Sequence, residues 1–169
     1  MDSFTEQILK AKASAKQRMY LFGAGLVIAA AIFVTMFMNG SIGLSILVLG
    51  IVLYVVAGNA QRYEYEYEIT NGDCDISRIT NQTNRKMIYS FVEGDVKRVL
   101  PVNSDKYRNE REINKNLIVQ NFTSRDDKHI EEWYAFFVTH NGEDQVVLLE
   151  LYEKALNQMQ ERYKRKLEK

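Results

Sequence analysis

The feature that most constrains this chain is an uninterrupted stretch, residues 19–61, that contains no Asp, Glu, Lys or Arg. The chain as a whole is 26% charged, so this stretch is unlike an ordinary surface segment. Asn39-Gly40-Ser41 divides it into two apolar arms, residues 19–38 and 42–58. As a helix, each arm spans roughly the 30 Å hydrocarbon thickness of a bilayer, and a backbone in lipid must satisfy its own hydrogen bonds. The sequence therefore predicts a transmembrane helical hairpin over residues 19–61.

Basic residues beside the arms predict the orientation of the hairpin. Those that precede the first arm are Lys10, Lys12, Lys16 and Arg18. Arg62 follows the second arm, and the turn between the arms has no basic residue. The positive-inside rule then places both termini in the cytoplasm, which predicts a multi-pass protein of the cytoplasmic membrane. A cleaved signal peptide ending at Ala29-Ala30-Ala31 is the alternative, but the apolar run continues past that point.

Residues 1–18 are predicted to form an N-terminal cytoplasmic amphipathic segment. Ser3-Phe4-Thr5-Glu6 fits a capping box, and a helix would place Phe4, Ile8 and Ala11 on one face. Such a helix could lie on the inner leaflet, held by acidic lipids. The alternative is a plain extension of the first transmembrane helix with a solvated basic side.

Small residues in the first arm predict close helix packing. Gly25 and Ala29 have the small-xxx-small spacing that lets a neighbouring helix approach. The neighbour is either the second arm, or a second copy of the chain or another membrane protein. Because neither arm contains a charged residue, the sequence shows no ion path or proton relay of the usual kind.

Residues 62–169 are predicted to form one cytoplasmic domain rich in β-strands. Residues 63–69 (YEYEYEI) alternate strictly between an aromatic or apolar residue and glutamate, which is typical of a half-buried strand with tyrosines inward and glutamates outward. Asn71-Gly72 then predicts a hairpin turn. Further strands are expected at residues 74–80, 86–92, 96–100, 117–122, 132–139 and 145–150, with a long surface loop at 103–116. An apolar stripe at helical spacing predicts a C-terminal helix and comprises Tyr152, Ala155, Leu156, Met159 and Tyr163.

Six or seven antiparallel strands followed by one helix resemble a pleckstrin-homology-like (PH-like) barrel or sheet capped by a helix. The resemblance rests on the segments YEYEYEITNGDCDIS, KMIYSFVEGDVKRV and DQVVLLELYEKALNQM. The layout is similar to a family of small uncharacterised two-pass membrane proteins of Gram-positive anaerobes with a cytoplasmic PH-like domain. That resemblance implies an architecture and no established activity.

The sequence offers little for catalysis, and we predict no catalytic residue, cofactor or metal site. His129-Ile130-Glu131-Glu132 lacks the HExxH spacing of a zinc helix, and His140 is expected in a hairpin turn. The single cysteine, Cys74, cannot form an internal disulfide, which suits a reducing compartment. The chain has a net charge of zero, which excludes the strongly basic footprint of a nucleic-acid-binding domain.

Basic residues of the domain are candidates for contact with lipid headgroups or a partner. They are Lys97, Arg98, Arg162, Lys164, Arg165 and Lys166. The alternative is a solvated face that balances the end of the C-terminal helix. Eukaryotic PH domains often bind inositol lipids, and the resemblance would place such a lipid site in the first hairpin turn of this domain. Here that turn reads Asn71-Gly72-Asp73 without a basic residue, so such a site is not carried over.

The leading functional hypothesis is a non-enzymatic docking or scaffold module, anchored in the lipid bilayer, that binds a protein partner or a second copy of itself. The first alternative is a module that binds anionic lipid at the membrane surface. The second alternative, from another class, is an enzyme that works at the membrane surface.

Overall fold

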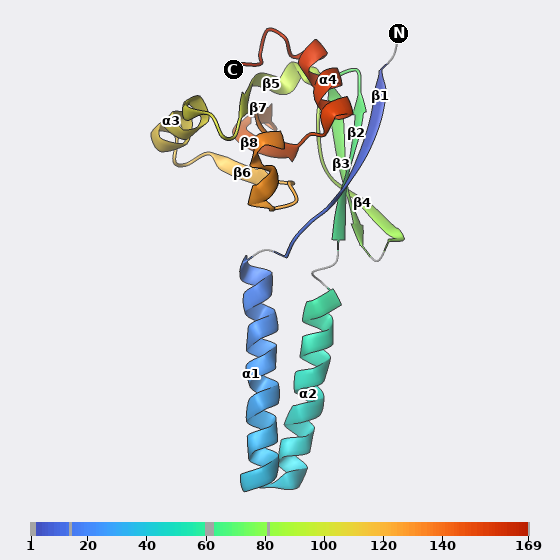
Figure 1. Cartoon of the computed structure of the whole chain (residues 1–169), viewed down its shortest axis with the longest axis vertical. Helices are drawn as coiled ribbons and strands as arrows, with labels where there is room; N and C mark the ends of the chain where they lie inside the picture. Colours follow the sequence, from blue (N-terminus) through green and yellow to red (C-terminus); the bar gives the residue numbers. More distant parts are fainter. Residues whose placement is uncertain (1–2, 14, 60–62, 81, 169) are drawn as a thin grey trace. The chain divides into compact units, whose positions relative to one another are not determined.

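The computed structural model describes residues 3–13, 15–59, 63–80 and 82–168 (Figure 1). The chain divides into two compact units. One unit is Lys12–Arg62 and holds the two apolar helices. The other combines Met1–Ala11 with Tyr63–Lys169 and holds all the strands of the described residues; we refer to it as the sheet unit.

The apolar unit consists of helix α1 (Ala15–Phe37) and helix α2 (Gly40–Asn59). Both helices are long and apolar enough to cross a membrane, as expected for a two-pass membrane protein. The helices are joined at Asn39, whose side-chain oxygen accepts the backbone N–H groups of Ser41 (3.1 Å) and Ile42 (3.2 Å). These bonds satisfy N–H groups that the first turn of α2 leaves without a helical partner.

Small residues are buried where the two helices meet, and Gly43 and Gly50 lie against Thr35, Ile28 and Val27 of α1. Ala24 and Ala31 are the buried residues of α1, and Gly43 and Gly50 are those of α2. The predicted Gly25–Ala29 pair does not contribute to this contact. A Cβ atom added at Gly25 would have no other heavy atom within 4 Å, and Ala29 is exposed. Small residues occur on more than one face of α1, so their spacing alone could not identify the face that meets α2.

We expect Gly43→Val to destabilise the helical hairpin by about 1–3 kcal/mol, the usual cost of overpacking. A Cβ atom at Gly43 would lie 2.1 Å from Thr35 Oγ1, 2.4 Å from Thr35 N and 2.6 Å from Thr35 Cα. Two of these are backbone atoms, which cannot rotate away. Unfolding in detergent, followed by circular dichroism, measures the loss. Gly25→Val makes the same change in open space and is the matched control; equal losses in both variants would contradict the assigned contact.

The first sheet is antiparallel, with strand order β1-β2-β3-β4. Its strands are β1 (Phe4–Lys10), β2 (Tyr63–Thr70), β3 (Asp73–Thr80) and β4 (Asn84–Phe91). The prediction of an amphipathic helix before the first arm is therefore wrong for residues 4–10, which pair with β2 from Phe4↔Thr70 to Lys10↔Glu64. The segment also alternates, because Thr5, Gln7 and Leu9 are buried and the residues between them are exposed. The segment thus fits both a helical and a strand pattern, and its pairing with β2 makes it a strand. The first helix begins only at Ala15.

The second sheet has strand order β5-β7-β8-β6, with β6 parallel to β8. Its strands are β5 (Val96–Pro101), β6 (Ile118–Asn121), β7 (Trp133–His140) and β8 (Glu143–Glu150). The described residues thus form eight strands in two open sheets rather than a closed, purely antiparallel barrel. One connection also differs from the expected loop at 103–116, since Asp105–Ile113 forms helix α3. Ser104 caps this helix by accepting the N–H of Tyr107 at 3.2 Å.

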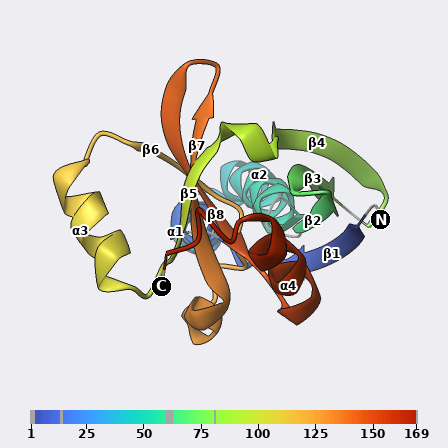
Figure 2. The same cartoon turned by 90° about the horizontal axis from the view of Figure 1, so that it is seen from above.

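The core of the sheet unit lies between the two sheets and helix α4 (Glu153–Arg162). The tyrosines of β2 face inward as predicted, and Tyr67 is fully buried. The predicted stripe on α4 is confirmed for Ala155, Met159 and Tyr163, which are all buried in the same core. Helix α4 packs against β1, as Figure 2 shows from above.

The residues after α4 lie along the outer edge of β5. Val99 N–H donates to Lys166 O at 2.8 Å, and Glu168 N–H donates to Val99 O at 3.1 Å. These two bonds form a parallel bridge between Val99 and Leu167. The end of the chain therefore covers an edge of the second sheet that would otherwise be open.

Glu66 is an exception among the glutamates of β2, which were expected to be exposed. It lies on the outer face of the first sheet, yet it is fully buried. Arg85 reaches it from β4, with Nη2 at 2.5 Å from Glu66 Oε1, and also contacts Glu68 at 3.5 Å. Burial raises the pKa of the Glu66 carboxyl; Arg85 lowers this pKa, and the nearby Glu6 carboxyl raises it.

Candidate functional site

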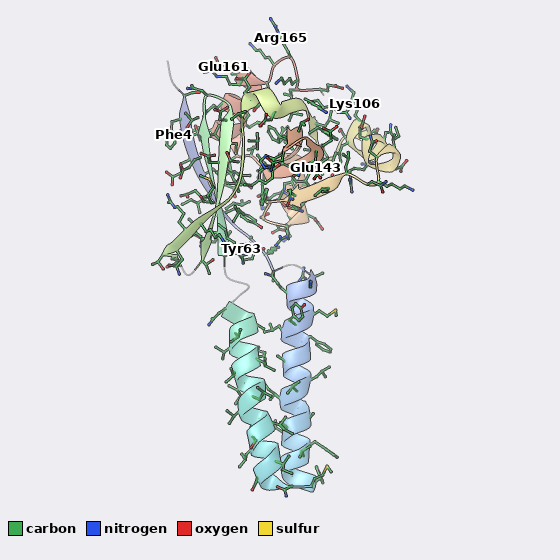
Figure 3. All side chains as sticks on the ribbon, turned by 180° about the vertical axis from the view of Figure 1, so that it is seen from behind. Phe4, Tyr63, Lys106, Glu143, Glu161 and Arg165 are labelled. Atoms are coloured by element: carbon green, nitrogen blue, oxygen red, sulfur yellow. The ribbon has the colours of Figure 1, made fainter. Side chains whose placement is uncertain are left out.

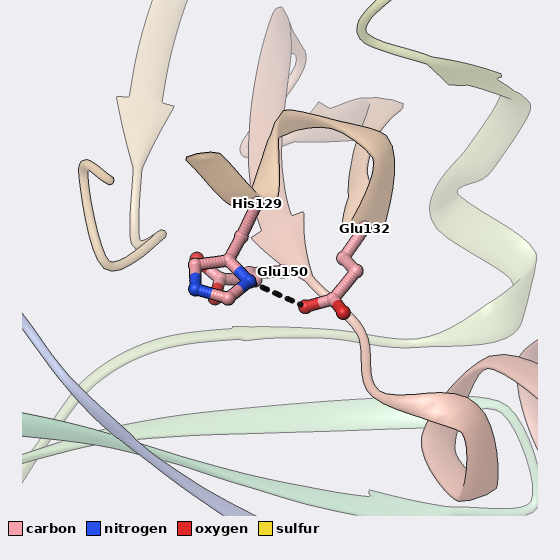
Figure 4. Close-up of side chains that lie close together, drawn as sticks. All are labelled: His129, Glu132 and Glu150. Carbon is pink, nitrogen blue, oxygen red and sulfur yellow. Dashed lines mark ion pairs between the residues drawn. The ribbon is translucent and has the colours of Figure 1, made fainter. Parts of the chain in front are cut away.

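Three side chains that can bind a metal ion converge at one end of strand β8. His129 and Glu132 belong to the 3₁₀ segment η2 (Asp127–Glu132), and Glu150 is the last residue of β8. Their nitrogen and oxygen ligand atoms all lie within 4.8 Å of one another. His129 Nδ1 is 3.7 Å from Glu132 Oε2, the pair drawn with a dashed line in Figure 4. We refer to these three residues as the histidine–glutamate cluster.

The loop that carries His129 is shaped by short-range side-chain hydrogen bonds. Asn121 Oδ1 accepts the backbone N–H of Thr123 (3.0 Å) and its hydroxyl (2.8 Å). Asp126 then caps η2 by accepting the N–H of Lys128 at 3.4 Å. His129 itself departs from helical geometry, with φ −108° and ψ 20°, so η2 bends at this residue. Polar residues in this loop therefore fix its path before strand β7 begins.

Glu150 is held firmly, because it is only 1% exposed and its Oε2 accepts two hydrogen bonds. The donors are Ser124 N at 2.9 Å and Trp133 Nε1 at 3.0 Å. Trp133 is also the residue directly opposite Glu150 in the β7–β8 ladder. A buried carboxylate needs such partners, since an ionised group without them is costly to desolvate.

Glu132 and His129 form the more accessible side of the cluster. Their side chains are 42% and 52% exposed, respectively. The Oε2 atom of Glu132 is nevertheless shielded from solvent and accepts no hydrogen bond from the described residues. The cluster thus combines one fixed carboxylate with two side chains that have room to adjust.

Sequence reasoning did not identify this cluster. His129-Ile130-Glu131-Glu132 lacks the HExxH spacing of a zinc helix, and no short motif connects this histidine with Glu150. The usable signal is the hairpin turn at Asn141-Gly142, because its register places Glu150 opposite Trp133 and hence beside the end of η2.

The structure also shows where the predicted contact residues of β5 lie. Lys97 Nζ is 2.7 Å from Asp144 Oδ1, and this lysine together with Thr139 lowers the pKa of the Asp144 carboxyl through hydrogen bonds. Arg98 forms an ion pair with Glu110 of α3 and lies over the Phe137 ring, 4.4 Å from its centroid. The hydrogen bond from Arg98 is the main cause of the lowered pKa of Glu110. Both cations thus have acidic partners within the chain.

The predicted contact residues at the C-terminal end lie next to β5 and to the β2–β3 turn. Arg162 Nη2 donates to Asn71 Oδ1 at 3.1 Å, and Lys166 Nζ donates to Glu93 O at 2.8 Å. Lys164 borders a shallow surface hollow beside α4, and Arg165 extends away from the rest of the sheet unit in Figure 3. Several of the predicted basic residues therefore hold other parts of the domain in place.

No curated protein and no solved structure matches the chain. The chain does match a family described as Bacterial PH-like domain (DUF6106), and the match covers residues 1–169. It includes the apolar helices as well as the two sheets and α4. The chain is therefore a member of the bacterial PH-like domain family DUF6106.

Proposed function

We propose that this chain is a membrane-anchored docking module whose sheet unit binds an extended segment of a partner protein at the free edge of β4. It acts by binding rather than by catalysis. The two apolar helices provide the anchor, and the basic residues beside them support a cytoplasmic position for both termini. Addition of a peptide strand to an exposed sheet edge is a common mode of peptide recognition.

The observation that carries this proposal is that the other long edge strands have further elements of the chain beside them. Helix α4 packs against β1, and Gln158 Nε2 donates to Ser3 O, just before β1, at 2.9 Å. The chain around Leu167 pairs with β5. Strand β6, at the far edge of the second sheet, has only four residues. Among the described residues, β4 is the eight-residue strand left with a neighbour on one side only. Its unpaired backbone groups can therefore pair with another chain.

The side chains of β4 indicate the chemistry of the partner. All residues of Asn84–Ile88 are exposed, including the apolar Met87 (60%) and Ile88 (37%). The strand contains Arg85 and Lys86 and no acidic residue. A complementary segment would be extended, with apolar side chains opposite Met87 and acidic side chains near Lys86.

The anionic-lipid alternative receives less support from the arrangement of the basic residues. Lys97 and Arg98 are paired with carboxylates. Arg162 donates to Asn71 Oδ1 and Lys166 donates to Glu93 O, so these two cations also bind groups within the chain.

Site-specific photo-crosslinking from Ile88 tests the docking proposal. We expect a photoreactive side chain at this position of the full chain, in the cells that make it, to give an adduct with one protein of defined mass. The same side chain at Ile113 is the control, because Ile113 is 77% exposed on α3 and lies outside the first sheet.

A companion substitution checks that the adduct reflects binding at the β4 edge. Met87→Glu places a negative charge where an apolar and acidic partner segment would lie, and it should reduce the adduct at least tenfold. Equal adduct yields at both positions, or a yield unaffected by Met87→Glu, would refute the proposal. An adduct of twice the mass of the chain would also refute it, in favour of self-association.

A further inference from the structure

We propose that the histidine–glutamate cluster is a binding site for a divalent transition-metal ion of the zinc class. Its ligands are His129 Nδ1 and carboxylate oxygens of Glu132 and Glu150. One imidazole nitrogen and two carboxylate oxygens form a donor set that suits Zn²⁺ and related first-row ions. The site is independent of the β4 edge and of the proposed docking function.

The geometry is close to what a metal ion requires. Ligand atoms that bind Zn²⁺ at about 2.0–2.2 Å in a tetrahedral site lie roughly 3.3–3.6 Å from one another. In the cluster, His129 Nδ1 and Glu132 Oε2 are already 3.7 Å apart, and the three ligand atoms lie within 4.8 Å. The remaining contraction falls on His129 and Glu132, which are partly exposed and can change side-chain torsions, while Glu150 stays in place.

The surroundings of Glu150 resemble the supporting shell of a metal site. Trp133 Nε1–H and Ser124 N–H both bind Oε2 and so fix the orientation of the carboxylate. A carboxylate has two oxygens and several lone pairs, so it can accept these bonds and still bind a cation. Hydrogen-bonded partners of this kind hold metal ligands in the orientation that binding needs.

Charge and hydrogen bonding also favour a cation at this position. The cluster brings two carboxylates next to one imidazole, which leaves it with a net negative charge in either protonation state of His129. Glu132 Oε2 is shielded from solvent but receives no hydrogen bond from the described residues. A divalent ion between the three side chains would balance the charge and give this oxygen a partner. Three protein ligands would leave a fourth position for water.

Fluorescence of Trp133 gives a direct test, because this is the single tryptophan of the chain and it contacts Glu150. The full chain in detergent, freed of metal with a chelator and dialysed, is titrated with Zn²⁺ alone. We expect a saturable change of Trp133 emission at one ion per chain. His129→Ala and Glu132→Gln should each weaken binding at least tenfold, and the double variant should abolish it. Both residues are partly exposed, so these variants are expected to fold; near-ultraviolet circular dichroism verifies this.

His140→Ala is the matched control for the loss of a histidine. His140 is the other histidine of the chain, and it stacks on Tyr89 with a centroid distance of 4.9 Å. Zn²⁺ binding should be unchanged in this variant. The absence of saturable binding would overturn the proposal. So would full binding by the folded double variant, or an equal loss in the His140→Ala variant.

Discussion

Removal of residues 3–10 is expected to abolish the cooperative unfolding of the sheet unit. Strand β1 forms a seven-residue ladder with β2, and its Leu9 is almost fully buried in the main core. Gln7 adds two hydrogen bonds with the end of β8, from its Nε2 to Glu150 O (2.7 Å) and from Tyr152 N to its Oε1 (2.9 Å). Burial of one leucine contributes about 1.5–3 kcal/mol and each hydrogen bond about 1 kcal/mol. Together with the ladder, this approaches the total stability of a small domain, about 5–15 kcal/mol.

The measurement compares two soluble proteins without the apolar helices. One is residues 63–168 alone, which should lack a sharp thermal transition. The other joins residues 3–11 to Tyr63 through a short Gly/Ser linker, and it should regain the transition. Such a linker is feasible because Ala11 N lies 3.3 Å from Tyr63 O. Similar transitions in both proteins would show that β1 is dispensable.

The second large effect is expected for Glu150→Ala, which should destabilise the chain by about 2–5 kcal/mol in the absence of metal. The substitution leaves the N–H groups of Ser124 and Trp133 without their acceptor, and each unsatisfied buried donor costs about 1–3 kcal/mol. Glu150→Gln keeps an acceptor oxygen and should cost less.

Urea unfolding with a chelator present, followed by circular dichroism, measures these differences. Glu143→Ala is the control at the other end of β8, where the side chain is exposed, and it should change the free energy of unfolding by less than about 0.5 kcal/mol. A similarly small change for Glu150→Ala would mean that the two donors find water or other acceptors.

Much of the fold followed from local patterns that leave little choice. The uncharged stretch specified two apolar helices, because its length and composition suit lipid and no ordinary surface. The Asn-Gly pairs that follow predicted strands specified β-hairpins. Both residues of each pair have positive φ, 54° and 99° at Asn71-Gly72 and 51° and 80° at Asn141-Gly142. Glycine adopts such angles freely and asparagine tolerates them, which is why these pairs mark tight turns.

The errors arose where distant contacts decide the structure. Phe4–Lys10 fits a short helix as well as a strand, and its partner β2 comes more than fifty residues later in the sequence. Strand β6 was predicted, but its parallel pairing with β8 was not, because alternation shows a strand's faces and not its direction. Helix α3 was missed for a different, local reason. It is polar and has no buried residue, so it lacks the apolar stripe by which helices are recognised in a sequence.

The histidine–glutamate cluster was missed for a related reason. Its members come from a loop and from the far strand of a hairpin, and a short motif search considers only neighbours in the sequence. Glu150 resembles any polar residue at the end of a strand until the β7–β8 register places it beside Trp133. A search along the predicted hairpin register would have brought these residues together.

The pairing of β1 with β2 has a consequence for biosynthesis. The first strand leaves the ribosome before the apolar helices, and its partner follows them, so at 5–20 residues per second Phe4–Lys10 waits on the order of several seconds for Tyr63–Thr70. During this time the unpaired backbone groups of Phe4–Lys10 are available to a chaperone or to another nascent copy of the chain. Adjacent strands of one sheet must share a compartment. If α1 and α2 cross a membrane, the ladder therefore requires that both flanks of the helical pair lie on the same side.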